Sequence, residues 1–257
     1  MKKFIVVVCA FFALSAAASA QFMNAGASAS KSSGTPMFSG DHPKSFSTFS
    51  LTYSPVNMTG KYDGLEVDLF KGFFGSEAGM NALSLNWTNA HNVYAPLPLY
   101  LEYGLGVQWG FASGDMSEEG YKSEISANFL SLKVPVSAVF DFAIPTTPIS
   151  VAPYVGLNLS GYLLGSAKNT YEYTGEGAEY MEDASGEEEM SFFSKEDMEG
   201  AGEPFNRFIL GLHIGARIGF NKFFLGIAYE GPLTNFYNKN GLKYYSNQVN
   251  ISLGLKF

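Results

Sequence analysis

The stretch from Leu99 to Phe111, LYLEYGLGVQWGF, alternates without a break between large apolar residues and residues that are mostly small or polar. Such period-two alternation predicts an extended β-strand with two chemically different faces. The pattern recurs, more or less strictly, over 47–56, 81–91, 129–142, 150–163, 207–220, 223–233 and 249–257. Together these eight segments predict an all-β chain.

The composition of the less apolar face indicates which way the strands turn. In 99–111 that face includes Gly104, Gly106 and Gly110, whereas a solvated sheet usually carries many Lys, Glu and Thr residues. Glycine is a poor residue for a solvent-facing strand, but it fits the crowded interior of a small barrel. We therefore expect the apolar faces to point outward into lipid. A soluble β-barrel that binds a ligand, with its apolar faces inward, is the alternative.

The connections between the segments alternate in length. Short links (NVYAPLP, AIPTTPI and NK) alternate with long ones. This spacing predicts an eight-stranded antiparallel up-and-down transmembrane β-barrel with short periplasmic turns and long extracellular loops. We expect the last strand to close the barrel against the first. Within the first long connection, 62–75 could form a loop, an additional strand or an amphipathic helix on Leu65, Leu69 and Phe73, and we expect a loop.

The first twenty residues, MKKFIVVVCAFFALSAAASA, predict a cleaved signal peptide. Residues 21–45 are rich in Ala, Ser and Gly and predict a flexible periplasmic lead-in, so the expected barrel spans 46–257. Cys9, the only cysteine, lies in the signal peptide, which excludes disulfides and thiolate metal sites from the exported chain.

The chain is acidic, with a net charge of −8, and has no cluster of Lys or Arg, so nucleic acid is not an expected partner. The third long connection, 165–206, holds 12 of the 24 acidic residues. We expect a solvated, partly disordered extracellular loop there. Divalent-cation binding and a partner surface are alternatives, but the segment lacks the spacing of a calcium-binding EF-hand loop. No cofactor is expected.

Seven ionisable residues fall on the predicted inner faces: Glu102, Lys133, Asp141, His213, Arg217, Glu230 and Lys256. Eight strands leave an interior just wide enough for side chains, so we expect a neutralising ion-pair network there. A selectivity lining or a catalytic cluster is the alternative. A two-residue turn at Asn221–Lys222 would place His213 directly across from Glu230. None of the three histidines is placed to reach a lipid head group on the extracellular side, so we expect no enzyme.

The segments PLYLEYGLGVQWGF, NFLSLKVPVSAVFDFAIP, PYVGLNLSGYLLG and VNISLGLKF resemble the outer-membrane β-barrel proteins of Bacteroides-type Gram-negative bacteria. These proteins include PorT-like barrels and, more distantly, the transmembrane domain of OmpA. The resemblance implies an outer-membrane location among lipid and lipopolysaccharide. It also implies that Phe257 is the terminal aromatic residue read by the barrel-assembly machinery.

For function, we expect a non-enzymatic structural or interaction protein that binds an extracellular or envelope protein through its loops. A small-solute, porin-like channel and a lipid-modifying outer-membrane enzyme are the alternatives.

Overall fold

The computed structural model describes residues 42–62, 65–68, 80–94, 96–174, 184–196, 204–239 and 241–257. These residues form twelve β-strands, and no helix among them is long and apolar enough to cross a membrane. The strands are β1 (Ser45–Tyr62), β2 (Leu65–Asp68), β3 (Met80–Tyr94), β4 (Leu99–Glu118), β5 (Tyr121–Phe140), β6 (Phe142–Ala143), β7 (Ile149–Tyr173), β8 (Ser185–Ser191), β9 (Phe208–Phe220), β10 (Phe223–Pro232), β11 (Tyr237–Lys239) and β12 (Leu242–Lys256).

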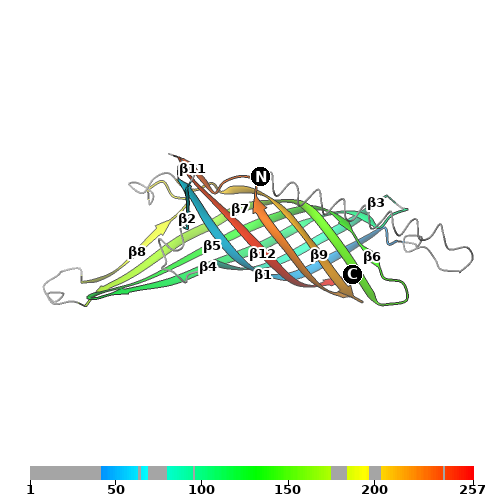
Figure 1. Ribbon diagram of the computed structural model, residues 1–257, viewed down its shortest axis with the longest axis horizontal. Helices are drawn as coiled ribbons and strands as arrows, with labels where there is room; N and C mark the ends of the chain where they lie inside the picture. The colour runs from blue at the N-terminus through cyan, green and yellow to red at the C-terminus, as the bar shows by residue number, and fades with distance from the viewer. Residues whose placement is uncertain are drawn as a thin grey trace, which may run out of the picture.

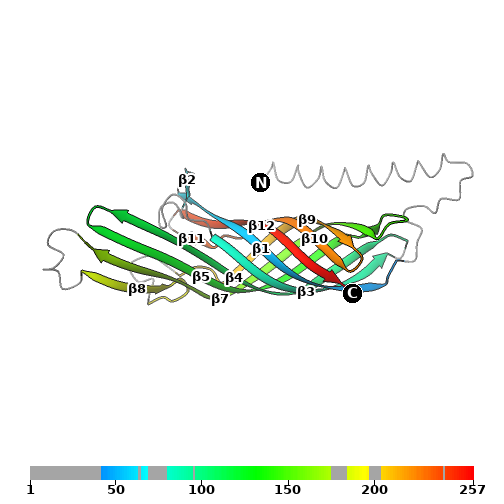
Figure 2. The same ribbon diagram turned by 90° about the horizontal axis from the view of Figure 1, so that it is seen from below.

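Eight of these strands form a closed antiparallel ring: β1, β3, β4, β5, β7, β9, β10 and β12, in chain order. The ring closes where β12 pairs with β1, with Leu253 opposite Leu51 and Lys256 opposite Thr48. Closure leaves neither of these two strands with an unpaired edge along the ring. Figures 1 and 2 show the strands running obliquely around one long barrel. The predicted eight-stranded antiparallel barrel is confirmed.

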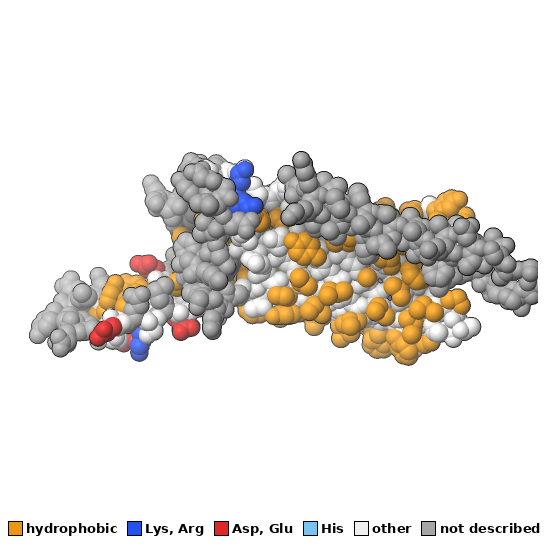
Figure 3. Space-filling model, viewed as in Figure 1, with side chains coloured by type: hydrophobic (Ala, Val, Ile, Leu, Met, Phe, Trp, Pro, Cys, Tyr) orange, Lys and Arg blue, Asp and Glu red, His pale blue; other side chains and the backbone are white. Residues whose placement is uncertain are grey.

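The two faces of the barrel wall are chemically inverted relative to a soluble protein. Apolar side chains on the outer face are largely exposed, for example Leu51 (51%), Leu85 (52%) and Ile227 (60%). Inside the wall, polar side chains such as Ser54 and Ser131 are buried. Figure 3 shows hydrophobic side chains spread over the barrel body. An apolar surface of this extent is unsuited to water and fits a lipid environment, which defines a transmembrane barrel.

The short connections lie together at one end of the barrel, the short-turn end. Asn221 and Lys222 join β9 to β10, and Asn221 adopts a positive φ of 55°, a conformation that asparagine tolerates well. As predicted, this turn pairs Phe220 with Phe223. Phe257, the last residue, is also at this end, where its backbone exchanges two hydrogen bonds with Ser47.

At the opposite end, the loop end, four strands continue well beyond the ring. β4 and β5 stay paired out to Glu118 and Tyr121, where Gly120 turns the chain with a φ of 83°. β7 continues to Tyr173, and β8 pairs along its other side. The expectation of a long loop between β4 and β5 is therefore wrong. The expectation of a solvated, partly disordered loop at 165–206 is also wrong where the chain forms the end of β7 and all of β8.

A smaller correction concerns 62–75. Residues Leu65–Asp68 form β2, which pairs with the end of β1, so the expected loop is a strand at those four positions. The other proposed helix positions, Leu69 and Phe73, lie outside the described residues, as do the predicted signal peptide and most of the lead-in. Ser45, the last residue assigned to the lead-in, is the first residue of β1.

Candidate functional site

Two ion pairs cross the lumen and join strands that are not neighbours. Arg217 on β9 donates to both carboxylate oxygens of Glu102 on β4, each at 2.6 Å. Lys133 on β5 donates to Glu230 on β10 at 2.8 Å. The side chains of both pairs are at most 15% exposed, so each charge is compensated by its partner and not by bulk water.

A third ion pair lies at the short-turn end, where Lys256 on β12 donates to Asp141 just after β5. The ammonium group of Lys256 also lies 4.3 Å from the centre of the Phe46 ring, a cation–π geometry. Six of the seven residues predicted to face inward therefore form three ion pairs inside the barrel. Their charges cancel, three acids against three bases.

The seventh residue, His213, forms a hydrogen bond over a strand position that has no side chain. In the strand register, Gly156 on β7 lies between Ser137 on β5 and His213 on β9. Since Gly156 has no side chain, Ser137 Oγ and His213 Nε2 meet over it at 2.8 Å. A Cβ atom at position 156 would overlap the backbone of β5 and lie 2.8 Å from His213 Nε2.

Glu230 lies directly across from His213 in the register, as predicted, but its hydrogen bonds go elsewhere. Besides Lys133, it accepts hydrogen bonds from the side-chain amides of Asn158 (2.9 Å), Gln248 (2.7 Å) and Asn250 (3.2 Å). Glu230 is thus the centre of a polar network that draws on β5, β7, β10 and β12. The predicted position of Glu230 across from His213 is therefore confirmed, while the hydrogen bond of His213 goes to Ser137.

A cavity of about 90 Å³ lies in the middle of the lumen, bounded on one side by these charged groups. On the other side it is bounded by short polar residues of β1, β3 and β12: Thr48, Ser50, Thr52, Ser84, Asn86, Thr88, Asn250 and Ser252. Asn158 Oδ1 borders this cavity and is the one buried side-chain polar atom of the described residues without a hydrogen-bond partner. The cavity has room for several water molecules, which could donate to that oxygen.

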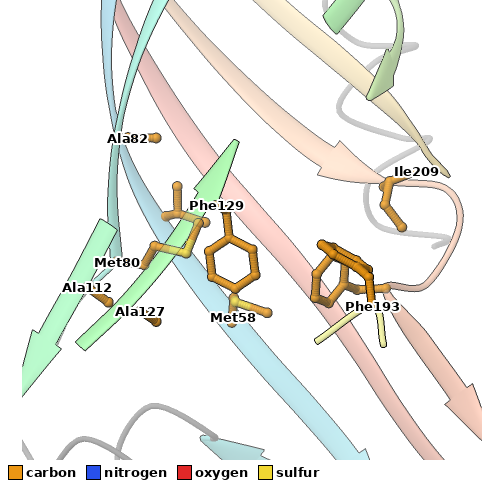
Figure 4. Packing of buried hydrophobic residues seen from close by; sticks show 10 residues of the cluster. Met58, Met80, Ala82, Ala112, Ala127, Phe129, Phe193 and Ile209 are labelled. Carbon is orange, nitrogen blue, oxygen red and sulfur yellow. The ribbon is translucent and has the colours of Figure 1, made fainter. Parts of the chain in front are cut away.

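Packed apolar side chains close the lumen at the loop end. This loop-end plug consists of Val56, Met58, Met80, Ala82, Ala112, Ala127, Phe129, Phe193, Ile209 and Phe236, with Tyr162, Ala167, Phe192, Phe205 and Tyr244 packed against it. Figure 4 shows Met58, Phe129 and Phe193 directed into the space between the strands. Phe129 stacks on Phe192 with ring centres 5.2 Å apart, and Arg207 lies 4.8 Å from the Phe193 ring.

Segments outside the ring strands supply several of these aromatic rings. Phe192 and Phe193 directly follow β8, Phe205 precedes β9, and Phe236 precedes β11. The acidic composition of 165–206 predicts a solvated loop, so this plug is not expected from the sequence. The available signal was the pair Phe192–Phe193, since adjacent large apolar residues in an acidic segment indicate burial.

A second apolar cluster lies inside the barrel near the short-turn end: Phe46, Ala90, Tyr100, Val139 and Ala152. Tyr100 is 1% exposed and packs edge-on against Phe46, with ring centres 4.9 Å apart. Its hydroxyl donates to the backbone oxygen of Pro43 at 3.1 Å, so the described start of the chain is attached to this cluster. The polar compartment is thus enclosed between two apolar clusters.

This enclosure limits what the lumen can do chemically. Ser137 and His213 have the residue types of a nucleophile and its base, but they are 3% and 6% exposed and lie deep between the two clusters. In the described part of the chain, no three His, Cys, Asp or Glu residues are grouped closely enough to hold a metal ion. The interior has the properties of a neutral, hydrogen-bonded core around a small polar cavity.

Exposed charged side chains lie on the protruding sheet, the part of β4, β5, β7 and β8 beyond the ring. Figure 3 shows acidic and basic side chains at this end of the molecule. Lys168 on β7 and Glu187 on β8 form an ion pair of 2.8 Å, with both side chains well exposed. On the barrel-axis face of the sheet, Tyr121 and Tyr173 are in ring contact at 5.0 Å.

Two other residues of interest lie on the outside of the short-turn end. Phe257 is 56% exposed, and its ring lies 5.8 Å from that of Trp87. His91 stacks on Tyr103 and hydrogen-bonds its hydroxyl at 3.1 Å. Aromatic residues at this level are typical of the interfacial girdle of a membrane barrel. The role of Phe257 in assembly remains a prediction.

The strand pairing, the apolar outside and the polar inside define the class: an eight-stranded antiparallel transmembrane β-barrel. No family model matches the chain, and no curated protein matches it. Among solved structures, it is similar to the attachment invasion locus protein Ail of Yersinia pestis, with 14% identity and a TM-score of 0.32, covering 84% of this chain and 100% of Ail.

It is also similar to Neisserial surface protein A, with 13% identity and a TM-score of 0.31, over 81% of this chain and 97% of that one. The translocator domain of the autotransporter NalP from Neisseria meningitidis is 12% identical with a TM-score of 0.37, over 84% of this chain and 90% of that domain.

Proposed function

We propose that this protein is a non-enzymatic outer-membrane β-barrel that acts as a structural and interaction protein. Its lumen is a rigid filled core, and its binding surface is the protruding sheet together with the loops at the same end. The observation that carries the proposal is the continuation of β4, β5, β7 and β8 beyond the ring into a sheet with charged, exposed side chains. Elements that leave the membrane region and carry exposed charge are suited to binding, whereas the ring is suited to anchoring.

The orientation follows from the connection lengths. Outer-membrane barrels place their short turns in the periplasm and their long connections outside the cell. We therefore assign the short-turn end to the periplasm and the protruding sheet to the cell surface. Export through the signal peptide 1–20 and recognition of Phe257 by the barrel-assembly machinery are part of the proposal. The proposal also includes contacts with lipopolysaccharide. It further includes kinship with Bacteroides-type, PorT-like barrels, which the four sequence segments quoted above support.

Two alternative functions have less support. A small-solute channel needs a continuous aqueous path, but the polar compartment lies between two packed apolar clusters. A lipid-modifying enzyme needs reactive groups at the level of the lipid head groups, but Ser137 and His213 face the lumen. Single-channel conductance in planar bilayers and lipid A mass spectrometry test these two alternatives directly.

The protruding sheet can be removed without changing the strand register of the ring. Residues 114–125 lie between the cross-strand partners Ser113 and Ser126, and 168–189 lie between Ala167 and Met190. Replacing each segment with a two-residue Asn-Gly turn gives a shortened barrel that keeps the ring and the aromatic residues of the plug. This shortened barrel is the matched control for binding.

The test is photo-cross-linking in intact cells that express the full-length or the shortened protein. We expect specific partner adducts with the full-length protein and their loss with the shortened one, at equal amounts of each in the outer membrane. Different gel mobility of unheated and boiled protein verifies that both barrels are folded. Identical adducts from the two proteins would contradict a binding role for the protruding sheet.

A further inference from the structure

Strand β8 is the margin of the protruding sheet. It pairs with β7 from Glu172 opposite Ser185 to Ser166 opposite Ser191, and within the described ranges no strand pairs with its other side. Figures 1 and 2 both place β8 at the border of the sheet. Along an unpaired edge, alternate backbone N–H and C=O groups point outward and can pair with another strand.

This edge has an unusual charge. β8 contains three consecutive glutamates, Glu187, Glu188 and Glu189. By strand alternation Glu187 and Glu189 lie on one face of the sheet and Glu188 on the other. Glu187 is paired with Lys168, and no ion pair of Glu188 or Glu189 with another described residue is found. A strand added beside β8 would therefore meet negative charge on both of its faces.

The charge determines which occupant fits. Two copies of β8 placed edge to edge would bring like charges together, which is unfavourable in cross-strand positions, so a second copy of this chain fits poorly. A strand rich in Lys or Arg would bring opposite charges to the same positions. The edge thus resists self-association while it remains complementary to a basic segment.

A tyrosine adds a second recognition element beside this edge. Tyr171 on β7 lies opposite Gly186 on β8, and a Cβ atom at position 186 would lie 2.6 Å from the Tyr171 hydroxyl oxygen. The ring therefore extends over the glycine toward the outer edge of β8. A Lys or Arg side chain entering beside Glu188 would reach this ring, and tyrosine faces attract cations.

We propose that the outer edge of β8 binds an extended basic segment of a protein partner by strand addition. The backbone of the segment pairs with β8, and its Lys or Arg side chains contact Glu187, Glu188, Glu189 and the ring of Tyr171. This inference rests on the proposed binding function of the protruding sheet and specifies the chemical class of partner.

The test measures binding of a synthetic peptide of alternating lysine and valine to the full-length barrel in lipid nanodiscs, by fluorescence anisotropy. A peptide of the same sequence that is methylated at every backbone nitrogen keeps the charge but has no backbone N–H to donate, and its methyl groups obstruct strand pairing. The edge variant is E187Q/E188Q/E189Q. The matched control variant is D115N/E119Q/E124Q, which removes the same charge from β4, β5 and the turn between them, away from β8.

We expect the unmodified peptide to bind and the methylated peptide to bind at least about tenfold more weakly, since strand addition relies on backbone hydrogen bonds. The edge variant should weaken binding by about tenfold or more and the control variant by less than about threefold, because charge-assisted contacts are strong only at close range. Absence of binding, equal binding of both peptides, or equal weakening by both variants would each overturn the proposal.

The edge variant also separates this proposal from the one on which it rests. In the intact-cell cross-linking experiment, partner adducts that persist in E187Q/E188Q/E189Q and disappear only in the shortened barrel would overturn strand addition at β8. The binding role of the protruding sheet would then stand. Adducts that persist in the shortened barrel would overturn that role itself.

Discussion

Most charged residues in the lumen form ion pairs. The loss in free energy of unfolding when one member is removed depends on how deeply its partner is buried. Glu230 is the clearest case, because its side chain is 13% exposed and that of Lys133 is 8% exposed. Removing one member of a buried pair leaves the other without compensation in a medium that solvates charge poorly. A surface pair loses little, because water replaces the partner.

We therefore expect Glu230→Leu to lower the free energy of unfolding by about 3–5 kcal/mol, since Lys133 is left buried and uncompensated. Glu187→Gln, which breaks the exposed pair with Lys168, should lower it by less than about 1 kcal/mol. Denaturant unfolding from lipid vesicles measures both values. A Glu230→Leu protein as stable as the wild type, or one that conducts ions, would favour the channel alternative.

Some glycines in the barrel wall are required by the close packing around them. Gly156 is needed where it is, because a Cβ atom there would overlap β5 and displace His213 from Ser137. We expect Gly156→Ala to destabilise the barrel by about 1–3 kcal/mol through overpacking.

Gly161 on the same strand is the matched control, because the nearest heavy atom to an added Cβ is 3.4 Å away. Gly161→Ala should change the free energy of unfolding by less than about 1 kcal/mol. If the two substitutions lower the free energy of unfolding equally, then loss of backbone freedom, and not disruption of the Ser137–His213 hydrogen bond, accounts for the destabilisation.

At the scale of elements, the loop-end plug connects the protruding sheet to the lumen. The chain passes directly from β8 into Phe192 and Phe193, so the segment that carries the acidic edge also supplies rings to the plug. The plug is held by ring contacts such as Phe129 with Phe236, at 6.0 Å, and by Arg207 against Phe193. We therefore expect its integrity to limit how fast water-soluble reagents reach the lumen from that end.

A cysteine at Ser246, a residue that borders a small lumen cavity beside Tyr162, reports on this access. We expect a charged methanethiosulfonate reagent to modify Ser246→Cys slowly when the plug is intact. Combining it with Phe193→Ala and Phe236→Ala should raise the rate about tenfold or more, because loss of a buried phenylalanine costs about 3–5 kcal/mol of packing.

Gly156→Ala in place of the two phenylalanine substitutions is the control for general loosening of the barrel, because it is expected to destabilise the wall away from the plug. An unchanged rate in the double phenylalanine variant would mean that the aromatic cluster does not limit access to the lumen.

At the scale of the whole molecule, the two ends of the barrel differ in chemistry and are proposed to face different compartments. Lys122 lies near the tip of the protruding sheet, and Lys222 lies in the turn between β9 and β10. Both are exposed lysines, so we expect cysteine at either position to react with the reagent in detergent.

We expect a membrane-impermeant maleimide to label Lys122→Cys on intact cells and Lys222→Cys only after the outer membrane is permeabilised. The wild-type chain, whose one cysteine is Cys9, is the background control. Labelling of Lys222→Cys alone on intact cells would mean that the barrel is inserted with the opposite orientation.

The eight-stranded ring can be predicted from the sequence alone. Alternation is a property of neighbouring residues along one strand, so the outward faces that contain Leu51, Leu105 and Ile227 could be assigned before any pairing was known. The register of β9 and β10 could be assigned in the same way, because a two-residue turn sets the pairing locally. Barrel closure followed from the requirement that strands in lipid have no free edge.

The pairing of side chains across the lumen, in contrast, depends on the three-dimensional arrangement of the strands. The contact of Ser137 with His213 depends on Gly156 lying between them, and that of Lys133 with Glu230 depends on how far the ring is staggered when it closes. Stagger is a property of all eight strands together and cannot be read from any one of them. The strand β8 and the rings of Phe192 and Phe193 were missed for the same reason. Their folding depends on β7 and on the lumen, which lie beside them in space and are not encoded in the local pattern of an acidic segment.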